Sequence, residues 1–249
     1  MPQLTVINPT ITHEWNEGHL WLYAGAASTD TQIRVVSLEC GTASIEKRAD
    51  DALAAAGVLR RAMEAEEEGS GAVIINCMDD PGLYAAREMV SIPVIGPAEA
   101  SMHLAAMLSH RFSVITTGTE DTSVVEELIL RYGLTQKAAS VRTIDIPVLA
   151  LDSDKEATLH AVVSAVEKAV LEDGAGAIIP GCTLMAELIS EIRARLAACG
   201  VSVPVLNPPL VALRLAETLI SLNLSHSPRT YVRPADKLMH WPGDPIGEH

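Results

Sequence analysis

Two stretches of the chain have similar sequences, EGSGAVIINC at residues 68–77 and DGAGAIIPGC at residues 173–182. They align without a gap at an offset of 105 residues (182 − 77), and each ends in a cysteine, Cys77 or Cys182. In each, glycines that indicate a turn precede a short apolar run rich in isoleucine, which is typical of a buried strand. The chain therefore contains an internal duplication.

The duplication extends outward from these two stretches. Three further pairs of segments match: LTVINPT at 4–10 with FSVITTG at 112–118, residues 33–35 with 141–143, and IPVIGP at 92–97 with VPVLNP at 203–208. Four apolar segments thus recur in the same order in both halves.

Helical spacing follows several of the apolar segments. The helical stretches are 52–68, 83–89, 123–132, 157–171 and 210–222. Apolar strands that alternate with amphipathic helices are typical of parallel sheets covered on both faces. We predict an α/β protein with two pseudo-symmetric doubly wound domains, each with a four-stranded parallel sheet.

The halves of the repeat also predict the domain bounds. The first lobe is expected to comprise residues 1–98 and 209–249, because the last helical stretch returns to it, and the second lobe residues 99–208. A single eight-stranded barrel also fits the number of strands, but similarity between halves favours two lobes.

Composition narrows the classes of function. The 249 residues carry a formal net charge of −14, which disfavours binding to nucleic acid or to anionic membranes. The start of the chain lacks a secretory signal, and the apolar region 89–108 is interrupted by Pro93, Pro97 and Glu99. We expect a cytoplasmic protein that acts on a small molecule.

Two of the cysteines are candidates for catalysis. Four are present, without the spacing of a zinc site, and cytoplasmic cysteines are expected to be thiols. Cys40 and Cys199 are interpreted as structural. A lone cysteine at a strand end is usually a small buried hydrophobe, but two at equivalent repeat positions indicate a shared function.

Parallel sheets bind ligands beyond the carboxyl ends of their strands, where the next helix begins. A helix N-terminus there would lower a thiol pKa from its ordinary value of about 8.5. If the lobes face each other across a cleft, Cys77 and Cys182 can reach opposite faces of one substrate carbon. One thiolate then removes a proton and the opposite thiol delivers another, which inverts the carbon.

Such a reaction also needs donors for the charge that develops on a neighbouring carbonyl oxygen. Backbone N–H groups are expected from Met78, Asp79, Thr183 and Leu184. Groups that can hold the rest of the substrate are Asn8, Thr116, Thr117 and Gly118. Asp79 and Asp80 are expected to cap a helix that begins near Pro81. The scheme requires no metal and no organic cofactor.

With these residues identified, the chain resembles the aspartate/glutamate/hydantoin racemase superfamily, in particular its hydantoin and allantoin racemase branch. The similar stretches are VINPT at 6–10, ASIE at 43–46, CMDDPGLYAARE at 77–88, PVIGPAEASM at 93–102, RFSVITT at 111–117 and the run that ends at Cys182. The resemblance implies a cofactor-independent racemase with Cys77 and Cys182 as acid and base, Asn8 and Thr117 near the substrate, and often a homo-oligomeric assembly.

The chain departs from the family pattern at several places that bear on the substrate, among them Asn207, where the branch commonly has an aspartate. The NPNT opening of the family is here Asn8-Pro9-Thr10-Ile11, and its Cys-Ala-Gly-Met segment is Cys182-Thr183-Leu184-Met185. We therefore count Thr10 and Leu184 among the expected substrate contacts. Two alternatives stay open: a cysteine-dependent decarboxylase or cis–trans isomerase of the same superfamily, and a small-molecule binding protein without turnover.

Overall fold

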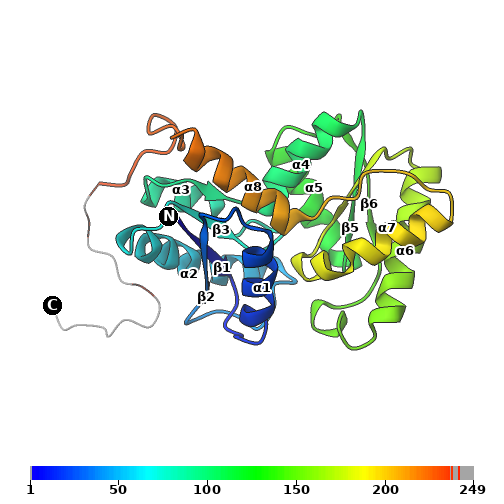
Figure 1. The fold of residues 1–249 in the computed structure, drawn as a ribbon, viewed down its shortest axis with the longest axis horizontal. Coiled ribbons are helices and arrows are strands. Elements are labelled where there is room, and N and C mark those ends of the chain that lie inside the picture. Colours follow the sequence, from blue (N-terminus) through cyan, green and yellow to red (C-terminus); the bar gives the residue numbers. More distant parts are fainter. Residues whose placement is uncertain (1, 236, 238–240, 242–249) are drawn as a thin grey trace. The chain divides into compact units, whose positions relative to one another are not determined.

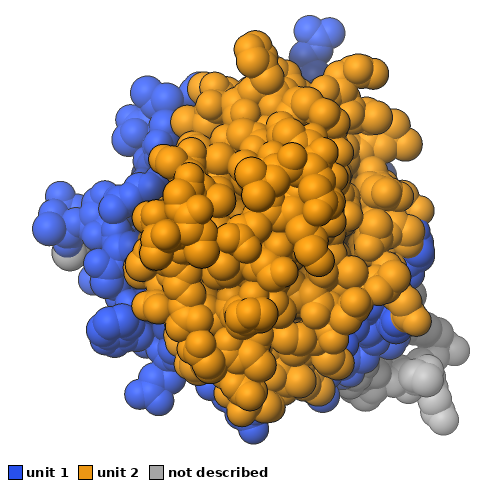
Figure 2. Space-filling view, turned by 90° about the vertical axis from the view of Figure 1, so that its right-hand side faces the viewer, with its two compact units in different colours: residues 1–96, 212–249 blue, residues 97–211 orange. Residues whose placement is uncertain are grey.

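The computed structural model describes residues 2–235, 237 and 241. Internal contacts divide the chain into two compact units, and Figure 2 colours the residues of each. Unit 1 comprises residues 1–96 and 212–249, and unit 2 comprises residues 97–211. Each unit is built around its own parallel sheet.

The sheet of unit 1 has four parallel strands in the order β2-β1-β3-β4. The strands are β1 (Gln3–Asn8), β2 (Gln32–Ser37), β3 (Ala72–Ile75) and β4 (Val94–Ile95). The helices are α1 (Asn16–Ala26), α2 (Arg48–Glu67), α3 (Leu83–Met89) and α8 (Pro208–Ser221), of which α8 runs into the unit from residue 212 onward.

Helices cover both faces of this sheet (Figure 1). On one face, α2 and α3 bury an aliphatic core that includes Ile7, Val73 and Ile75. On the other face, α8 lies against α1, since Arg214 donates to the carbonyl oxygen of Ala26 at 2.6 Å. The last helix thus packs on the first unit.

The sheet of unit 2 has three parallel strands in the order β6-β5-β7. The strands are β5 (Phe112–Thr116), β6 (Ala138–Thr143) and β7 (Ala177–Pro180). The α-helices are α4 (Pro97–Leu108), α5 (Thr122–Arg131), α6 (Lys155–Leu171) and α7 (Ile189–Ala198). Short 3₁₀ helices are η1 (Thr119–Asp121), η2 (Val148–Ala150) and η3 (Thr183–Leu188). Figure 1 shows α4 and α5 on one side of the sheet and α6 and α7 on the other.

The predicted fourth strand of the second sheet is reduced to one bridge, between Ile178 and Val205. The Ile178 N–H donates to the Pro204 carbonyl oxygen at 2.8 Å, and the Leu206 N–H donates to the Ile178 carbonyl oxygen at 2.9 Å. Pro204 has no N–H to extend the ladder, and α8 begins at Pro208. The prediction of four regular strands is therefore correct for unit 1 and wrong for unit 2.

The duplicated segments occupy corresponding strands. The first pair forms the inner strands β1 and β5, which are flanked on one side by β2 and β6 and on the other by β3 and β7. The fourth pair forms β4 and the bridge at Val205. Two separate sheets replace the alternative of a single barrel. None of the helices in the described part of the chain is both long enough and apolar enough to cross a membrane.

Candidate active site

Cys77 lies at the carboxyl end of β3 and is half-buried. The backbone N–H of Asp79 points at its sulfur, with 3.5 Å between the two heavy atoms. A turn follows, in which the Asp80 N–H donates to the Cys77 carbonyl oxygen at 3.2 Å. The Asp79 N–H is thus directed at the thiol itself.

The helix that follows Cys77 begins at Leu83, slightly later than the expected start near Pro81. The first residue of α3 is Leu83, its N-cap is Gly82, and no side chain caps it. Asp80 has a φ of 49° and Gly82 a φ of 67°, and a right-handed helix cannot pass through such left-handed residues. Asp79 and Asp80 therefore do not have the predicted capping role, and the thiol of Cys77 precedes a turn.

A buried polar network surrounds Asn8, where β1 ends beside β3. The Asn8 side-chain oxygen lies 2.9 Å from Asn76 Nδ2 and 2.9 Å from His19 Nδ1. The Asn8 amide nitrogen donates to Asn16 Oδ1 at 2.7 Å, and the Tyr23 hydroxyl donates to Asn76 Oδ1 at 2.9 Å. The network joins the residue before Cys77 to the end of β1 and to α1.

Burial sets the protonation of this network. It lowers the pKa of His19 from 6.5 to about 4, and it raises the pKa of the Tyr23 phenol. At neutral pH both side chains are therefore uncharged.

Two residues near Asn8 in the sequence or in contact with it have a buried polar atom without a partner. Across the described residues, buried side-chain atoms that lack a hydrogen-bond partner are Thr10 Oγ1, His19 Nε2 and Ser101 Oγ. Two of these three belong to residues near Asn8, since Thr10 follows it by two positions and His19 contacts it. Buried polar groups are normally paired, so these atoms have capacity to bind a further polar group.

Cys182 occupies the equivalent place after β7 in unit 2. It is half-buried and is the N-cap of η3, and its carbonyl oxygen accepts from the Met185 N–H at 3.1 Å. Here the predicted junction between strand and helix is correct, although the helix is of the 3₁₀ type. The two cysteines thus share a place after the strand but differ in the backbone that follows.

Gly181 explains how β7 brings Cys182 close to β5. The Gly181 N–H donates to the Ile115 carbonyl oxygen at 2.7 Å. A Cβ atom at position 181 would lie 2.9 Å from that oxygen and 3.0 Å from the Cα of Thr116. Only glycine fits this approach, which sets Cys182 beside the end of β5.

The end of β5 supplies the other predicted contacts of unit 2. Thr116 and Thr117 are buried, and the Thr117 hydroxyl donates to Asp121 Oδ2 at 2.9 Å. The Gly118 N–H donates to the same carboxylate oxygen at 2.8 Å. The backbone donor of Gly118 is therefore already used within the protein, while the oxygen of Thr117 can still accept.

The remaining predicted contacts divide between the units. Met78 and Thr183 are buried at 4% and 7% exposure. Leu184 and Cys182 are half-buried and pack against the aliphatic core of unit 2. The core of unit 2 thus contacts both side chains.

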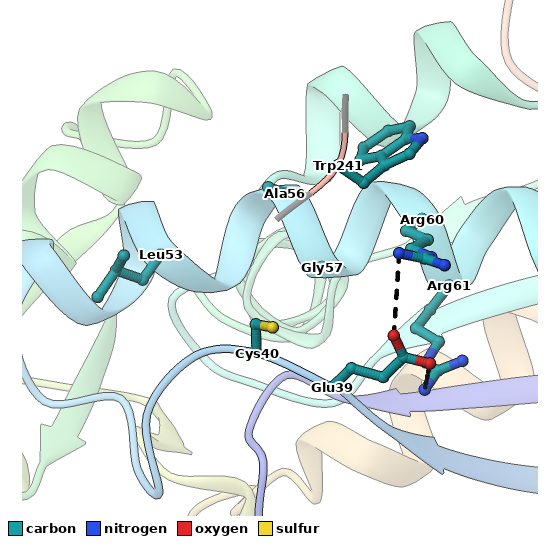
Figure 3. Close-up of a pocket in the computed structure, with 8 residues that line it drawn as sticks. All are labelled: Glu39, Cys40, Leu53, Ala56, Gly57, Arg60, Arg61 and Trp241. Carbon is teal, nitrogen blue, oxygen red and sulfur yellow. Dashed lines mark hydrogen bonds and ion pairs between the residues drawn. The ribbon is translucent and has the colours of Figure 1, made fainter. Parts of the chain in front are cut away.

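The other two cysteines lie elsewhere. Cys40 and Cys199 are exposed, so burial does not explain either of them. Cys40 lines a small pocket against α2, where Glu39 pairs with Arg60 and Arg61 (Figure 3). In the described residues, no three His, Cys, Asp or Glu side chains gather to hold a metal ion.

Known proteins are similar to this chain in sequence and in fold. The Asp/Glu/Hydantoin racemase family matches residues 5–216, which include both half-buried cysteines. The chain belongs to this family. Its hydantoin racemase and allantoin racemase relatives support an isomerase of the racemase type.

Individual relatives agree with this assignment. The hydantoin racemase of Pseudomonas sp. (strain NS671) is 38% identical over 236 residues, which cover 94% of this chain and 93% of the relative. The structure of allantoin racemase from Klebsiella pneumoniae has a TM-score of 0.90 at 35% identity and covers 96% of both chains. Allantoin racemase from Pseudomonas fluorescens has a TM-score of 0.89 at 33% identity, with 96% of this chain and 99% of that chain covered.

Three polar residues contact Asn8 or one of its partners and are not among the candidates that the sequence indicates. They are His19, Tyr23 and Asn76. Asn76 carried a usable signal, because it directly precedes Cys77 in the repeat, where unit 2 has Gly181. His19 and Tyr23 are four residues apart on α1, the spacing of one helix face, but nothing local indicates what that face contacts.

Proposed function

We propose that this racemase inverts C5 of a five-membered cyclic amide, such as a substituted hydantoin or allantoin, by proton transfer between two thiols. The observation that carries the proposal is the equivalent placement of Cys77 and Cys182, each half-buried after the strand that flanks the inner strand of its sheet. The relatives named hydantoin racemase and allantoin racemase support this substrate class. The free thiols support a cytoplasmic setting.

The proposed reaction is balanced in protons and electrons. One cysteine, as thiolate, removes the proton from C5, and the electron pair of the C–H bond moves toward the adjacent carbonyl to give an enolate. The other cysteine, as thiol, delivers its proton to the opposite face of C5 as the carbonyl re-forms. The configuration at C5 is inverted, one sulfur has gained a proton and the other has lost one. Neither a redox step nor a cofactor is part of this scheme.

Polar groups beside each cysteine are suited to hold the ring. In unit 1 these are the Asn8 amide and the Thr10 hydroxyl, whose oxygen has no partner in the protein. In unit 2 they are the oxygen of Thr117 and the backbone N–H groups at the start of η3. A fixed donor at the enolate oxygen stabilises the transition state more than the ground state.

The test is to incubate one enantiomer of a substituted hydantoin with the protein in deuterated water. We expect the optical rotation to fall to zero while deuterium enters at C5. Cys77→Ala and Cys182→Ala are each expected to lower the racemisation rate by at least about a thousandfold, because each removes one partner of the proton transfer.

The two exposed cysteines provide matched controls. Cys40→Ala and Cys199→Ala also remove one thiol each and are expected to keep the wild-type rate. Wild-type racemisation that survives in either Cys77→Ala or Cys182→Ala would exclude the two-thiol mechanism. Release of carbon dioxide from an arylmalonate without racemisation of any hydantoin would favour the decarboxylase alternative.

A further inference from the structure

His19 is a buried titratable residue that the proposed reaction does not use. It lies on α1 at 7% exposure, and its Nδ1 is 2.9 Å from Asn8 Oδ1 and 3.1 Å from Asn76 Nδ2. Its other ring nitrogen, Nε2, is buried and has no hydrogen-bond partner. Packing alone does not account for this arrangement, because a buried unpaired nitrogen is unfavourable.

The tautomer of His19 is assigned from the network. Asn8 Oδ1 is an acceptor with two lone pairs, and it already accepts from Asn76 Nδ2 at 2.9 Å. If His19 Nδ1 carried no hydrogen, two acceptors would face each other at 2.9 Å. With a hydrogen on Nδ1, both lone pairs of Asn8 Oδ1 are used and Nε2 is a bare acceptor. The 3.1 Å approach of Asn76 Nδ2 to His19 Nδ1 is then not a hydrogen bond, because both nitrogens donate to Asn8 Oδ1. The neutral Nδ1–H form is therefore favoured.

This assignment fixes what Asn8 can offer a ligand. Its oxygen is occupied by His19 and Asn76, so its amide cannot turn over without facing two donors with its own donor group. One hydrogen of its Nδ2 is bound to Asn16 Oδ1 at 2.7 Å. Asn16, His19 and Asn76 leave the second Nδ2 hydrogen unused, and it is the donor that Asn8 can present.

We propose that His19 is a positioning residue: its neutral Nδ1–H holds the Asn8 amide so that the second Nδ2 hydrogen faces an oxygen of the substrate. This inference rests on the proposed function, since it takes the ring carbonyl that gains charge during proton transfer as the partner of Asn8. Asn76, which precedes Cys77, shares the same acceptor, so one cluster aligns the donor and the start of the cysteine loop.

Two substitutions of similar polarity separate positioning from packing. In His19→Asn the side-chain N–H falls near the place of the imidazole Nδ1, and in His19→Gln it falls near the place of Nε2. We expect His19→Asn to keep kcat within about fivefold of wild type. We expect His19→Gln to lower kcat by about tenfold to a hundredfold, with KM changed less than about threefold, because the lost alignment matters most in the transition state.

The experiment measures kcat and KM for a substituted hydantoin, the thermal midpoint of each variant, and the ¹⁵N shifts of His19 in the wild-type protein at pH 7. Support requires the Nδ1–H tautomer and a loss of kcat in His19→Gln that exceeds the loss in His19→Asn at similar thermal midpoints. Equal kcat values in both variants, losses of kcat that only follow the thermal midpoint, or an Nε2–H tautomer would each overturn it.

The racemisation rate of the wild-type protein distinguishes a failure of the His19 proposal from a failure of the proposed function. If the wild-type protein racemises hydantoins and His19→Gln does so equally well, the role of His19 is wrong while the proposed function stands. If the wild-type protein racemises none of the cyclic amides, the proposed function fails, and the role of His19 fails with it.

Discussion

His19 links the pH of the solution to the stability of unit 1. Burial lowers its pKa from 6.5 to about 4, so the unfolded state takes up a proton before the folded state as the pH falls. The stability that goes with the neutral ring is present above pH 6.5 and is lost between pH 6.5 and about 4. We expect the wild-type protein to lose about 3 kcal/mol more free energy of unfolding than His19→Asn between pH 7.5 and 4.

Urea titrations at four pH values in that interval measure this difference. Since the carboxylates of the chain titrate in both proteins, only the difference between the two curves reports on position 19. Parallel curves for wild type and His19→Asn would contradict the account of a buried neutral imidazole.

The close approach at Gly181 gives a second prediction for a single residue. In Gly181→Ala the new methyl group meets backbone atoms of Ile115 and Thr116, which cannot move aside as a flexible side chain can. We expect a loss of about 1–3 kcal/mol in the free energy of unfolding and at least about tenfold in the racemisation rate, since Cys182 shifts with the strand.

Gly25→Ala is the matched control for Gly181→Ala. Gly25 lies within α1, and a Cβ atom there would meet nothing within 4 Å. Alanine should therefore stabilise the helix by up to about 1 kcal/mol and leave the rate unchanged. Thermal unfolding and a rotation assay measure both effects, and a Gly181→Ala protein as stable and active as Gly25→Ala would refute the steric argument.

The sequence identifies the two cysteines but does not indicate which residues contact the segments around them. Cys77 and Cys182 are recognisable because the repeat places them at one offset, which needs no knowledge of the fold. The contacts of Asn76 with Asn8 and His19 span 68 and 57 residues, so they follow from strand pairing and from the packing of α1. No local pattern encodes contacts at that separation.

The duplication of strands and turns extends to an ion pair. Arg34 on β2 pairs with Glu68 in the turn before β3, and Arg142 on β6 pairs with Asp173 in the turn before β7. The second pair is bidentate, with Arg142 Nε 2.6 Å from Asp173 Oδ2 and Arg142 NH2 2.8 Å from Asp173 Oδ1. The Arg142 guanidinium also holds the pKa of Asp173 below its ordinary value.

Burial should make these equivalent pairs unequal in strength. The side chains of Arg142 and Asp173 are 25% and 20% exposed, whereas those of Arg34 and Glu68 are 41% and 46% exposed. Double-mutant cycles with alanine are expected to give a coupling of about 1 kcal/mol for Arg142–Asp173 and below about 0.5 kcal/mol for Arg34–Glu68. Equal couplings would show that burial and bidentate geometry do not distinguish the pairs.

Secondary structure followed the sequence closely where periodicity is strong. The stretches 83–89 and 157–171 correspond to α3 (Leu83–Met89) and α6 (Lys155–Leu171). In the region 89–108, Pro97 interrupts the apolar run and is also the first residue of α4. Proline at a helix start and proline inside an apolar run look alike until the neighbouring strand is known.

For the whole molecule, we propose assembly into a homo-oligomer. Support comes from α1, where the adjacent large apolar side chains Leu20 and Trp21 are 41% and 82% exposed. Size-exclusion chromatography with light scattering should give a mass of two or more chains of 26.5 kDa at micromolar concentration. A mass of one chain over the whole concentration range would contradict this proposal.

The central claim, that each thiol serves one face of the substrate carbon, is tested most directly by deuterium exchange without inversion. Cys77→Ser and Cys182→Ser are incubated in deuterated water with each pure enantiomer of a substituted hydantoin, and exchange at C5 is followed by NMR above the uncatalysed rate. We predict that neither variant racemises and that each exchanges a different enantiomer, because the remaining thiol meets only one face. Exchange of the same enantiomer by both variants, or racemisation at the wild-type rate by either, would contradict the account.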